Sequence, residues 1–469
     1  MVLIATSASL VACRPPALPG AGIVSPASGS PVEGCSAGRG PGRLFEGSEV
    51  EGHLSADASR PGQLVAAWQQ DRFEFGGARA VLTAVSSDGG MTWRRSEMPQ
   101  LSLCGGARAG TPGAFQRVTD PWLVHGSDKD VYLATLSVDV DPASVFGVGR
   151  EAILVTRSRD GGRSWSRPVA VITDQNPAVF NDKPSLSAHH QRPGRLYAAW
   201  GLLERRGFLT EGVLMLSTSS DHGASWSPPR PIFDPGDAAS AFAPQIAALD
   251  GGRLLAVWTT VRTQSDGRFT FELSALTSDD DGRTWSRPAI IARPETNEVI
   301  EPTSGLAVVD GAHIPALAVD RTGGIIYVAW LERVGSVNAF RLALSRDGGR
   351  SWEAAEGVTP RRGGLLPSLA VSPSGEVALG GLELVSDRAH LTARPLLATC
   401  AASACVAESD WQVMSPRGPV VDLARAPLTE GPFVGDYLGL AWTGSGFGLL
   451  YAATDGGPGA TSQYLVTSN

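Results

Sequence analysis

Acidic and basic side chains recur just ahead of short apolar segments along this chain of 469 residues. Arginine guanidinium groups bind carboxylates through paired, charge-assisted hydrogen bonds, and carboxyl groups transfer protons in hydrolytic reactions. The residues at these positions are Glu51, Arg117, Asp120, Asp182, Lys183, Gln245, His313, Arg361, Arg362, Asp436 and Tyr437. Three further arginines follow other apolar segments: Arg72, Arg262 and Arg333. These side chains do chemistry together only if the fold brings them to one place.

Other kinds of site find no support in the sequence. No glycine-rich phosphate loop follows a strand and opens a helix, and no serine stands in a nucleophile elbow. No histidine or cysteine cluster has the spacing of a zinc site, and no calcium loop is evident. We therefore expect neither a cofactor nor a metal ion.

A repeated octet indicates the elements that could position the polar residues. It follows an alternating apolar run each time, which predicts a hairpin turn. Aspartate in such a turn accepts local backbone hydrogen bonds, and glycine supplies a backbone angle closed to other residues. The octets are SSDGGMTW (86–93), SRDGGRSW (158–165), SSDHGASW (219–226), SDDDGRTW (278–285) and SRDGGRSW (345–352), with Asp88, Asp160, Asp221, Asp280 and Asp347 as the structural aspartates.

A second repeat runs in phase with the first. Short segments of the form LVAAW end at Trp68, Trp200, Trp258 and Trp330, upstream of four of the octets. The repeat length of about 60 to 70 residues is typical of a four-stranded sheet repeated around an axis. We therefore expect an all-β protein.

The octets resemble the Asp box, or BNR repeat, and the chain resembles the sialidase-like β-propellers over residues 45–469. The resemblance implies a β-propeller of four-stranded blades. Hairpin counting favours seven blades, with six as the alternative because the catalytic sialidases have six. The last blade runs out one strand short, and we expect a strand at about 43–50 to complete it and close the ring.

The same resemblance implies roles for individual residues. Arg72, Arg262 and Arg333 would hold a substrate carboxylate, Tyr437 would be the nucleophile with Glu301 as its partner, and Asp120 would be a further catalytic residue. Substrate binding would fall to Asp182, Lys183, His313 and Asp436. The chain departs from the family at two places: Glu51 or His53 stands where an arginine is expected, and Glu74 is the nearest acid after Arg72.

Two functions from different classes stay open. The first is an exo-acting glycoside hydrolase of the sialidase type with a non-standard active site. The alternative is a non-catalytic surface propeller that binds glycan or protein, so the sequence leaves open whether the protein is an enzyme. Each site residue also has a structural interpretation: arginines pair with acids at a rim, aspartates cap turns, and Tyr437 and His313 belong to the core.

The cysteines and the N-terminus suggest export. Residues 1–13 end in Leu-Val-Ala-Cys, which resembles a lipoprotein cleavage box with Cys13 as the lipidation site, although no basic residue precedes the apolar run. Residues 14–44 would form a flexible tether rich in proline, glycine and serine. The remaining cysteines suffice for two disulfides: Cys35, Cys104, Cys400 and Cys405. In the sixth blade, which lacks an octet, a disulfide between Cys400 and Cys405 would close the hairpin turn that the octet closes elsewhere.

Composition limits the partners. A net charge of −8 and a pI near 5.5 argue against nucleic acid and against an anionic membrane surface. We expect a monomer that meets glycans or glycoconjugates, touches a membrane only through an N-terminal lipid, and is either a cell-envelope lipoprotein or secreted.

Overall fold

The computed structural model describes residues 22–25, 30–38, 40–206, 209–386, 391–401, 404–454 and 457–468. Cys13 and the predicted signal peptide lie outside these residues. Within them the chain is built of β-strands, with three short 3-10 turns at Asp250–Gly252, Glu408–Asp410 and Leu423–Arg425. The expectation of an all-β protein is confirmed.

The described strands form five sheets, of four, eight, four, eight and five strands. Antiparallel pairing within these sheets divides them into seven groups of four strands, one of which carries β26 as a fifth. The first four groups are β2 (Leu44–Ala56), β3 (Leu64–Phe73), β4 (Ala78–Ser86), β5 (Arg94–Arg95); β6 (Arg117–His125), β7 (Val131–Val140), β8 (Val148–Ser158), β9 (Val169–Asp174); β10 (Val179–Ala188), β11 (Leu196–Arg206), β12 (Leu209–Ser219), β13 (Arg230–Phe233); and β14 (Ala239–Ala248), β15 (Leu254–Thr263), β16 (Phe269–Ser278), β17 (Ala289–Ala292).

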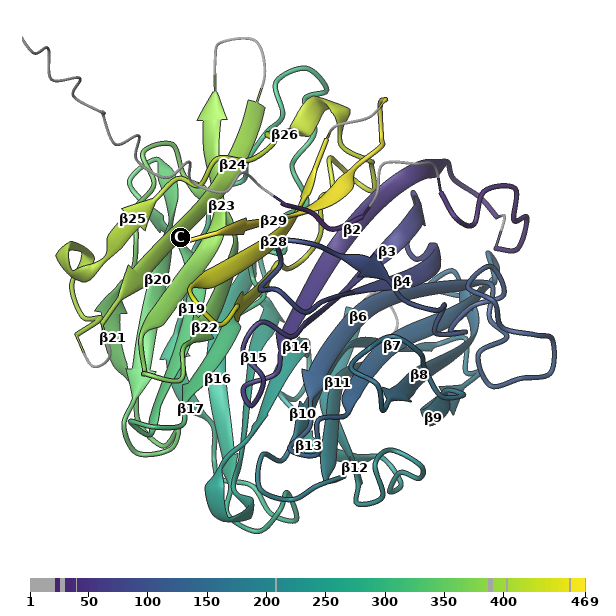
Figure 1. Ribbon diagram of the computed structural model, residues 1–469, viewed down its shortest axis with the longest axis horizontal. Coiled ribbons are helices and arrows are strands. Elements are labelled where there is room, and N and C mark those ends of the chain that lie inside the picture. Colours follow the sequence, from purple (N-terminus) through teal and green to yellow (C-terminus); the bar gives the residue numbers. More distant parts are fainter. Residues whose placement is uncertain are drawn as a thin grey trace, which may run out of the picture.

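The last three groups are β18 (Ala316–Asp320), β19 (Ile325–Val334), β20 (Val337–Ser345), β21 (Glu353–Glu356); β22 (Gly364–Val371), β23 (Val377–Ser386), β24 (Leu391–Cys400), β25 (Gln412–Met414), with β26 (Val421–Asp422) also on β24; and β27 (Gly439–Trp442), β28 (Phe447–Ala453), β29 (Ser462–Thr467), β1 (Gly22–Ile23). In Figure 1 the chain colour passes from purple through blue and teal to green and yellow, and the yellow strands end beside the purple ones.

The first and last described strands pair with each other, although the sequence suggested a different strand for this position. Gly22 pairs with Leu465, so β1 supplies the fourth strand of the last group. The stretch expected to do this, 43–50, instead begins β2, which pairs with β3 as the first strand of the first group. β2 also packs against β27 and β28 of the last group. The predicted tether is thus partly bound to the domain.

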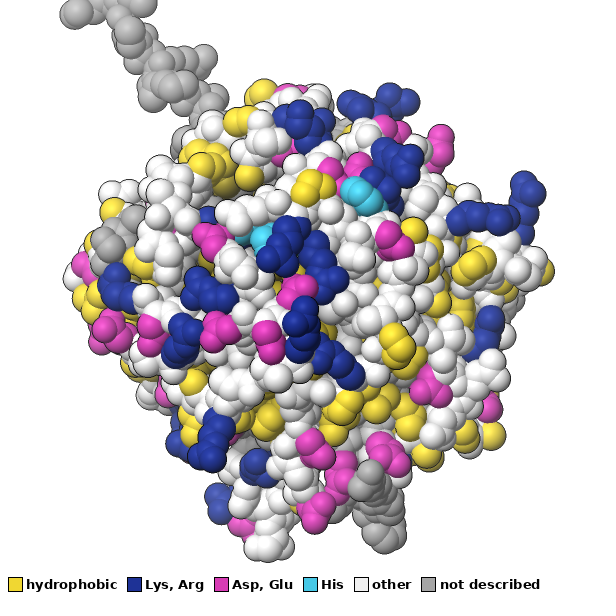
Figure 2. All heavy atoms as spheres, turned by 90° about the horizontal axis from the view of Figure 1, so that it is seen from below, with side chains coloured by type: hydrophobic (Ala, Val, Ile, Leu, Met, Phe, Trp, Pro, Cys, Tyr) yellow, Lys and Arg dark blue, Asp and Glu magenta, His cyan; other side chains and the backbone are white. Residues whose placement is uncertain are grey.

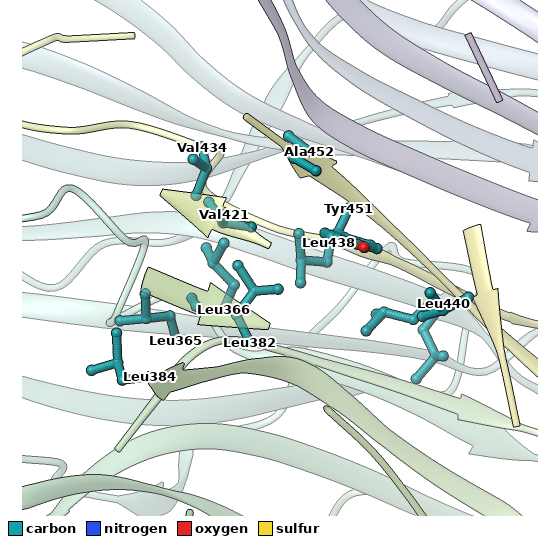
Figure 3. Close-up of a cluster of buried hydrophobic side chains, with 14 of the residues drawn as sticks. Leu365, Leu366, Leu382, Leu384, Val421, Val434, Leu438, Leu440, Tyr451 and Ala452 are labelled. Atoms are coloured by element: carbon teal, nitrogen blue, oxygen red, sulfur yellow. The ribbon is translucent and has the colours of Figure 1, made fainter. Parts of the chain in front are cut away.

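Apolar side chains fill the spaces between neighbouring groups. Figure 3 shows a cluster that includes Leu365 and Leu382 of the sixth group and Leu440 and Tyr451 of the seventh. Each fully buried leucine of this kind stabilises the fold by about 1.5–3 kcal/mol. Inside four groups, the tryptophans that end the second repeat, Trp68, Trp200, Trp258 and Trp330, are buried. The in-phase repeat therefore marks the core.

The five octets form five matching turns, hereafter the octet turns. In the second, Ser158 Oγ donates to Asp160 Oδ1 at 2.7 Å, and the same oxygen accepts the backbone N–H of Ser164 at 3.0 Å. Ser158 Oγ in turn accepts the N–H of Gly162 at 2.8 Å. Gly162 has a φ of 91°, and a Cβ there would lie 2.8 Å from Val65 of the preceding group. The remaining octets repeat these bonds.

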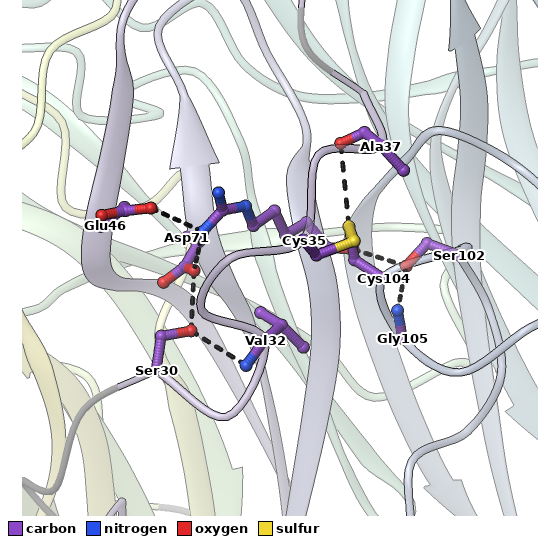
Figure 4. Close-up of a disulfide and its surroundings, with 10 residues drawn as sticks. Ser30, Val32, Cys35, Ala37, Glu46, Asp71, Ser102, Cys104 and Gly105 are labelled. Atoms are coloured by element: carbon purple, nitrogen blue, oxygen red, sulfur yellow. Dashed lines mark hydrogen bonds and ion pairs between the residues drawn. A yellow bond between two sulfur atoms is a disulfide. The ribbon is translucent and has the colours of Figure 1, made fainter.

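Two disulfides confirm the cysteine pairing. Cys400 joins Cys405 in the connection from β24 to β25, where the sixth group lacks an octet. Cys35 joins Cys104 and fixes the N-terminal residues to the segment between β5 and β6 (Figure 4). Within the described residues, no helix has the length and apolar character that a membrane crossing requires. Acidic and basic side chains are interspersed on the face seen in Figure 2.

Candidate functional site

The first strand of five groups carries the same irregularity, a β-bulge whose first residue has a left-handed backbone. The residues and their φ values are Glu51 (52°), Asp120 (54°), Lys183 (50°), Ala243 (48°) and Leu366 (56°). The second bulged residue is Gly52, Pro121, Pro184, Pro244 or Pro367, and proline fits a bulge because it has no N–H to pair. A bulge re-aims a side chain at about 1–2 kcal/mol of local strain for a non-glycine residue.

Three of these bulged side chains open onto one cavity of about 430 Å³, hereafter the chamber. Glu51, Asp120 and Lys183 line it together with Asp182 and Asp436. The other walls come from the arginines Arg72 and Arg117 and from an apolar rim that includes Phe75, Phe146 and Phe180. The structure thus brings together five of the predicted site residues: Arg72, Asp120, Asp182, Lys183 and Asp436.

A buried glutamine links the acid and the arginine of the chamber. Gln69 donates its side-chain N–H to Glu51 Oε2 and, at 2.8 Å, to Thr119 Oγ1. Its carbonyl oxygen accepts from Arg72 Nη1 at 3.0 Å. Gln69 is fully buried, so these bonds hold Glu51 and Arg72 in fixed positions.

The two chamber arginines are buried without an acidic partner among the described residues. Arg117 is 2% exposed and Arg72 is 7% exposed. Each guanidinium stacks on a phenylalanine, Arg117 on Phe73 at 3.9 Å and Arg72 on Phe433 at 4.0 Å. Arg117 Nη2 and Arg72 Nε are buried and donate to no partner among the described residues. Burial, with a contribution from Arg72, lowers the pKa of Arg117 to about 10, so the guanidinium of Arg117 remains cationic at neutral pH.

The acidic side of the chamber holds its charge unevenly. Burial first, and then the charges of Asp120 and Asp436, raise the pKa of Glu51 well above its ordinary value, which favours the protonated form of this carboxyl group. Burial alone would raise the pKa of Asp436, but its ion pair with Lys183 and hydrogen bonding to Glu51 hold that pKa below the usual range. Burial raises the pKa of Asp182 to about 7, opposed by Lys183. A proton donor and an ionised carboxylate therefore stand side by side.

Tyr437 lies next to the chamber, but its hydroxyl is engaged. It donates to the carbonyl of Pro121 at 3.1 Å, and the ring packs edge-on against His53 and Trp122 at 6.0 Å. Burial first, and then the negative charges of Glu51, Asp120, Asp436 and Asp182, raise the pKa of Tyr437 far above its ordinary value. A nucleophilic phenolate is therefore strongly disfavoured here.

The remaining predicted catalytic residues do not reach Tyr437. Arg262 is exposed and donates to the carbonyl of Pro235 at 3.2 Å, and Arg333 pairs with Glu295 at the surface. Glu301 accepts the N–H groups of Thr303 and Ser304 and so closes its own turn.

His313, predicted to bind substrate, stacks on Phe271 with ring centroids 3.4 Å apart. It lines a neighbouring cavity of about 420 Å³ that also contains Lys183, Asp310 and Asp436. Burial lowers the pKa of His313 to about 4, so its ring is neutral.

Glu51 and Arg117 are among the polar residues that precede apolar segments, and the sequence assigns neither of them a catalytic or binding role. A signal for Glu51 was available: VEGHL has the same register as TDPWL and DKPSL, with the bulged residue followed by glycine or proline. No such signal marks Arg117, which is positioned by residues distant in sequence.

One set of potential metal ligands occurs among the described residues, on the side of the octet turns. Asp128, Asp130 and His222 approach within 4.8 Å of one another. Arg157 makes an ion pair with Asp130, and Asp128 bonds to His222 at 2.8 Å. These bonds satisfy the cluster internally, so it does not call for a cation.

Comparison with known proteins finds a partial sequence match and similar folds, but no matching family model. No family model matches the chain. Over 193 residues it is 28% identical to a sialidase of Micromonospora viridifaciens, a match that spans 36% of this chain and only 29% of that protein.

Among solved structures, an alpha-L-arabinanase of Penicillium chrysogenum complexed with arabinobiose superposes with a TM-score of 0.51 at 15% identity, covering 82% of this chain and 99% of that one. A mutant Trypanosoma rangeli sialidase displaying trans-sialidase activity gives a TM-score of 0.42 at 14% identity, covering 76% of this chain and 54% of that one. These glycosidases are β-propellers. At 15% identity, the similarity to the arabinanase shows a shared fold, and the sialidase of Micromonospora viridifaciens is similar in sequence to part of this chain.

Proposed function

We propose that the seven strand groups are the blades of a closed β-propeller, that the octets are Asp boxes, and that the chamber removes an acidic monosaccharide from the end of a glycan. The observation that carries the proposal is that two buried guanidinium groups and a carboxyl group of raised pKa line one cavity. The relation to a sialidase over part of the chain supports the same class of substrate.

The arginine pair argues for an anionic substrate. Burying a charged group without a counter-charge is unfavourable, and Arg72 and Arg117 each retain an unpaired buried N–H. A carboxylate entering the chamber would satisfy both groups with charge-assisted hydrogen bonds. The phenylalanine rings beneath the guanidinium groups fix the planes in which those bonds form. The substrate carboxylate therefore fits against this wall.

The acidic residues of the chamber supply the proton chemistry. The raised pKa of Glu51 favours its protonated form, which would give its proton to the glycosidic oxygen as the bond to the anomeric carbon breaks. Asp120 would take a proton from the water that adds to that carbon. A carboxylate attached to or near the anomeric carbon repels an anionic nucleophile, and the hydroxyl of Tyr437 is engaged with Pro121. We therefore infer attack by water, with inversion at the anomeric carbon.

The test is hydrolysis of a panel of fluorogenic glycosides by the soluble domain: a sialoside, a glucuronide, a galactoside and an arabinofuranoside. The proposal requires that release is greatest for an acidic sugar and falls at least tenfold in Arg117→Gln. Arg262→Gln, at an exposed site, is the matched control. Preference for a neutral sugar, or equal activity of both variants, would contradict the proposal.

The engaged hydroxyl of Tyr437 also favours the second candidate, a propeller that binds an acidic glycan without cleaving it. If none of the glycosides in the panel is hydrolysed, and glycan binding depends on Arg117, that alternative would be established. The two disulfides support a further proposal, that the protein is exported, because disulfides persist in oxidising compartments. Lipidation of Cys13 stays a prediction, to be checked by mass spectrometry of the mature protein.

A further inference from the structure

The N-terminal loop, residues 30–38 and 40–43, contributes to the lining of the chamber although it precedes the first strand group. Pro41 lines the chamber beside Arg117. Two attachments hold the loop in place. Cys35 is joined to Cys104, and Ser30 Oγ donates to Asp71 Oδ2 at 2.7 Å, an oxygen that also pairs with Arg79 at 3.0 Å (Figure 4).

The loop contacts Arg117 through its backbone. The carbonyl oxygen of Gly38 accepts a hydrogen bond from Arg117 Nε at 2.9 Å. A Cβ at Gly38 would lie 2.6 Å from the carbonyl oxygen of Gln116 and 3.1 Å from Arg117 Cγ. A Cβ at Gly40 would lie 3.2 Å from Arg117 Nη2. Only glycine therefore permits this close approach of loop and side chain.

The other contacts of Arg117 show what the loop contributes. Arg117 Nη1 donates to the carbonyl oxygen of Gly76 at 2.9 Å, and the guanidinium lies on the ring of Phe73. These contacts leave Nη2 as the donor without a protein partner. The bond to Gly38 fixes the rotation of the group about its long axis, and so determines where Nη2 is presented.

We propose that the disulfide-held N-terminal loop is a positioning element of the substrate site: Cys35–Cys104 holds the carbonyl of Gly38 against Arg117, and this contact aims the guanidinium at the substrate carboxylate. The proposal rests on the proposed function for its substrate but not for its geometry. It makes Gly38 a positioning residue and Arg117 the binding residue. It also makes binding of the acidic sugar sensitive to reduction of one disulfide and insensitive to reduction of the other.

The loop offers a matched pair of variants. Gly34 and Gly38 both have a φ of 77°, but a Cβ at Gly34 would meet nothing within 4 Å. Gly34→Ala and Gly38→Ala therefore impose the same backbone strain, and only Gly38→Ala displaces the contact with Arg117. We expect Gly38→Ala to raise KM for the acidic glycoside about tenfold with kcat unchanged, because the lost bond orients a group that holds substrate and transition state alike. Gly34→Ala should keep the wild-type KM.

The disulfides give a second matched pair. Cys35→Ser with Cys104→Ser should raise KM as Gly38→Ala does, whereas Cys400→Ser with Cys405→Ser should not, although both remove a cross-link. Melting temperatures of all four variants separate loss of positioning from loss of folding. Equal KM values for the two double variants, both folded, would overturn the proposal.

A readout that needs no substrate keeps this proposal separate from the proposed function. Phenylglyoxal labels accessible guanidinium groups, and peptide mass spectrometry reports the labelling of Arg117, which is 2% exposed in the native loop arrangement. We expect labelling of Arg117 to rise several-fold in Gly38→Ala and in the Cys35/Cys104 variant but not in their controls. If no glycoside is hydrolysed, the proposed function fails while this result still supports the positioning role. Equal labelling of Arg117 in Gly38→Ala and Gly34→Ala would overturn it.

Discussion

The octet turns and the chamber are both built from repeated backbone, but they use the repeat in opposite ways. In the octet turns the backbone and the side chains recur together, and each aspartate bonds within four residues of itself. At the chamber the same left-handed bulge recurs, yet it presents Glu51, Asp120 and Lys183 in three groups and Ala243 and Leu366 in two others. Side chains that repeat with the backbone hold the fold, and side chains that differ at a repeated position build the site.

The same contrast appears in the reach of the bonds. Asp160 contacts only its own turn, whereas Lys183 pairs with Asp436, which lies more than half the chain away in sequence. Local bonds form in an isolated hairpin. The chamber exists only after the strand groups have come together, so its chemistry depends on the whole fold.

The largest expected effect separates the two regions by activity. Glu51→Gln removes the proton that the chamber would give to the leaving oxygen, so kcat/KM should fall by about 10²- to 10⁴-fold. The melting temperature should hold or rise, because a neutral amide replaces a carboxyl group whose ionised form is disfavoured by burial. Steady-state kinetics and thermal unfolding of the same preparation measure both quantities. A folded variant with wild-type kcat/KM would remove Glu51 from the mechanism.

A smaller effect should separate them by stability. Asp160→Ala deletes an acceptor of two backbone N–H groups and two hydroxyl groups in the second octet turn, at a loss of about 1–2 kcal/mol of unfolding free energy. The kinetic constants should stay at wild-type values. Urea unfolding beside Arg159→Ala, in the same turn, gives the comparison. A loss of activity without a loss of stability would show that the octet turns are not merely structural.

The two regions should also respond to pH in opposite directions. Burial by itself would raise the pKa of Asp347, but hydrogen bonds within its turn outweigh this effect and lower the pKa to about 2. The contribution of Asp347 to stability is therefore lost as pH falls from about 4 toward 2. Burial raises the pKa of Asp182 to about 7, so the folded state binds a proton that the unfolded state releases, and stability is lost as pH rises from about 4 toward 7.

Each such group changes the unfolding free energy by at most about 1.4 kcal/mol per pH unit. Urea unfolding from pH 3 to pH 8 should therefore show a slope at each side, with Asp182→Asn flattening only the alkaline side and Asp347→Asn only the acid side. The same slope in all three proteins would mean that these groups do not carry the shifts.

The smallest effects are expected at two arginines on the protein surface. Arg262→Gln and Arg333→Gln should each alter unfolding free energy by less than about 0.5 kcal/mol, because both side chains are solvent-exposed. Their kcat/KM should remain within about threefold of wild type by the same reasoning. A tenfold loss in either would restore the arginine trio that the sequence suggested and would weaken the distinction between the protein surface and the chamber.

Much of the fold could be predicted because its signals are local. The octets encode hairpin turns through residues within eight positions, and the tryptophan segments mark buried strands. The closing strand could not be predicted, because Gly22–Ile23 is two residues long and has no alternation to recognise. The longer pattern at 43–50 was the natural candidate, yet it belongs to β2.

The site was predicted in part for a related reason. Arg72 and Arg262 both stand four residues after a buried tryptophan, but Asp71 has a φ of 60° and interrupts the regular alternation before Arg72. No described residue of β15 has such an angle, so Arg262 follows the ordinary alternation to the surface. An irregularity of one residue turns the side chains that follow it to the opposite face of the strand, and no sequence pattern predicts where it occurs.

The most direct test of the account is the binding of free sugars, measured by calorimetry on wild type and Arg117→Gln, with N-acetylneuraminic acid and glucuronic acid as acidic probes and galactose as the neutral one. The account predicts that an acidic sugar binds wild type, that galactose does not, and that Arg117→Gln loses at least tenfold in affinity for the acid. Equal affinity of the two proteins for the acidic sugar, or tighter binding of galactose, would contradict it.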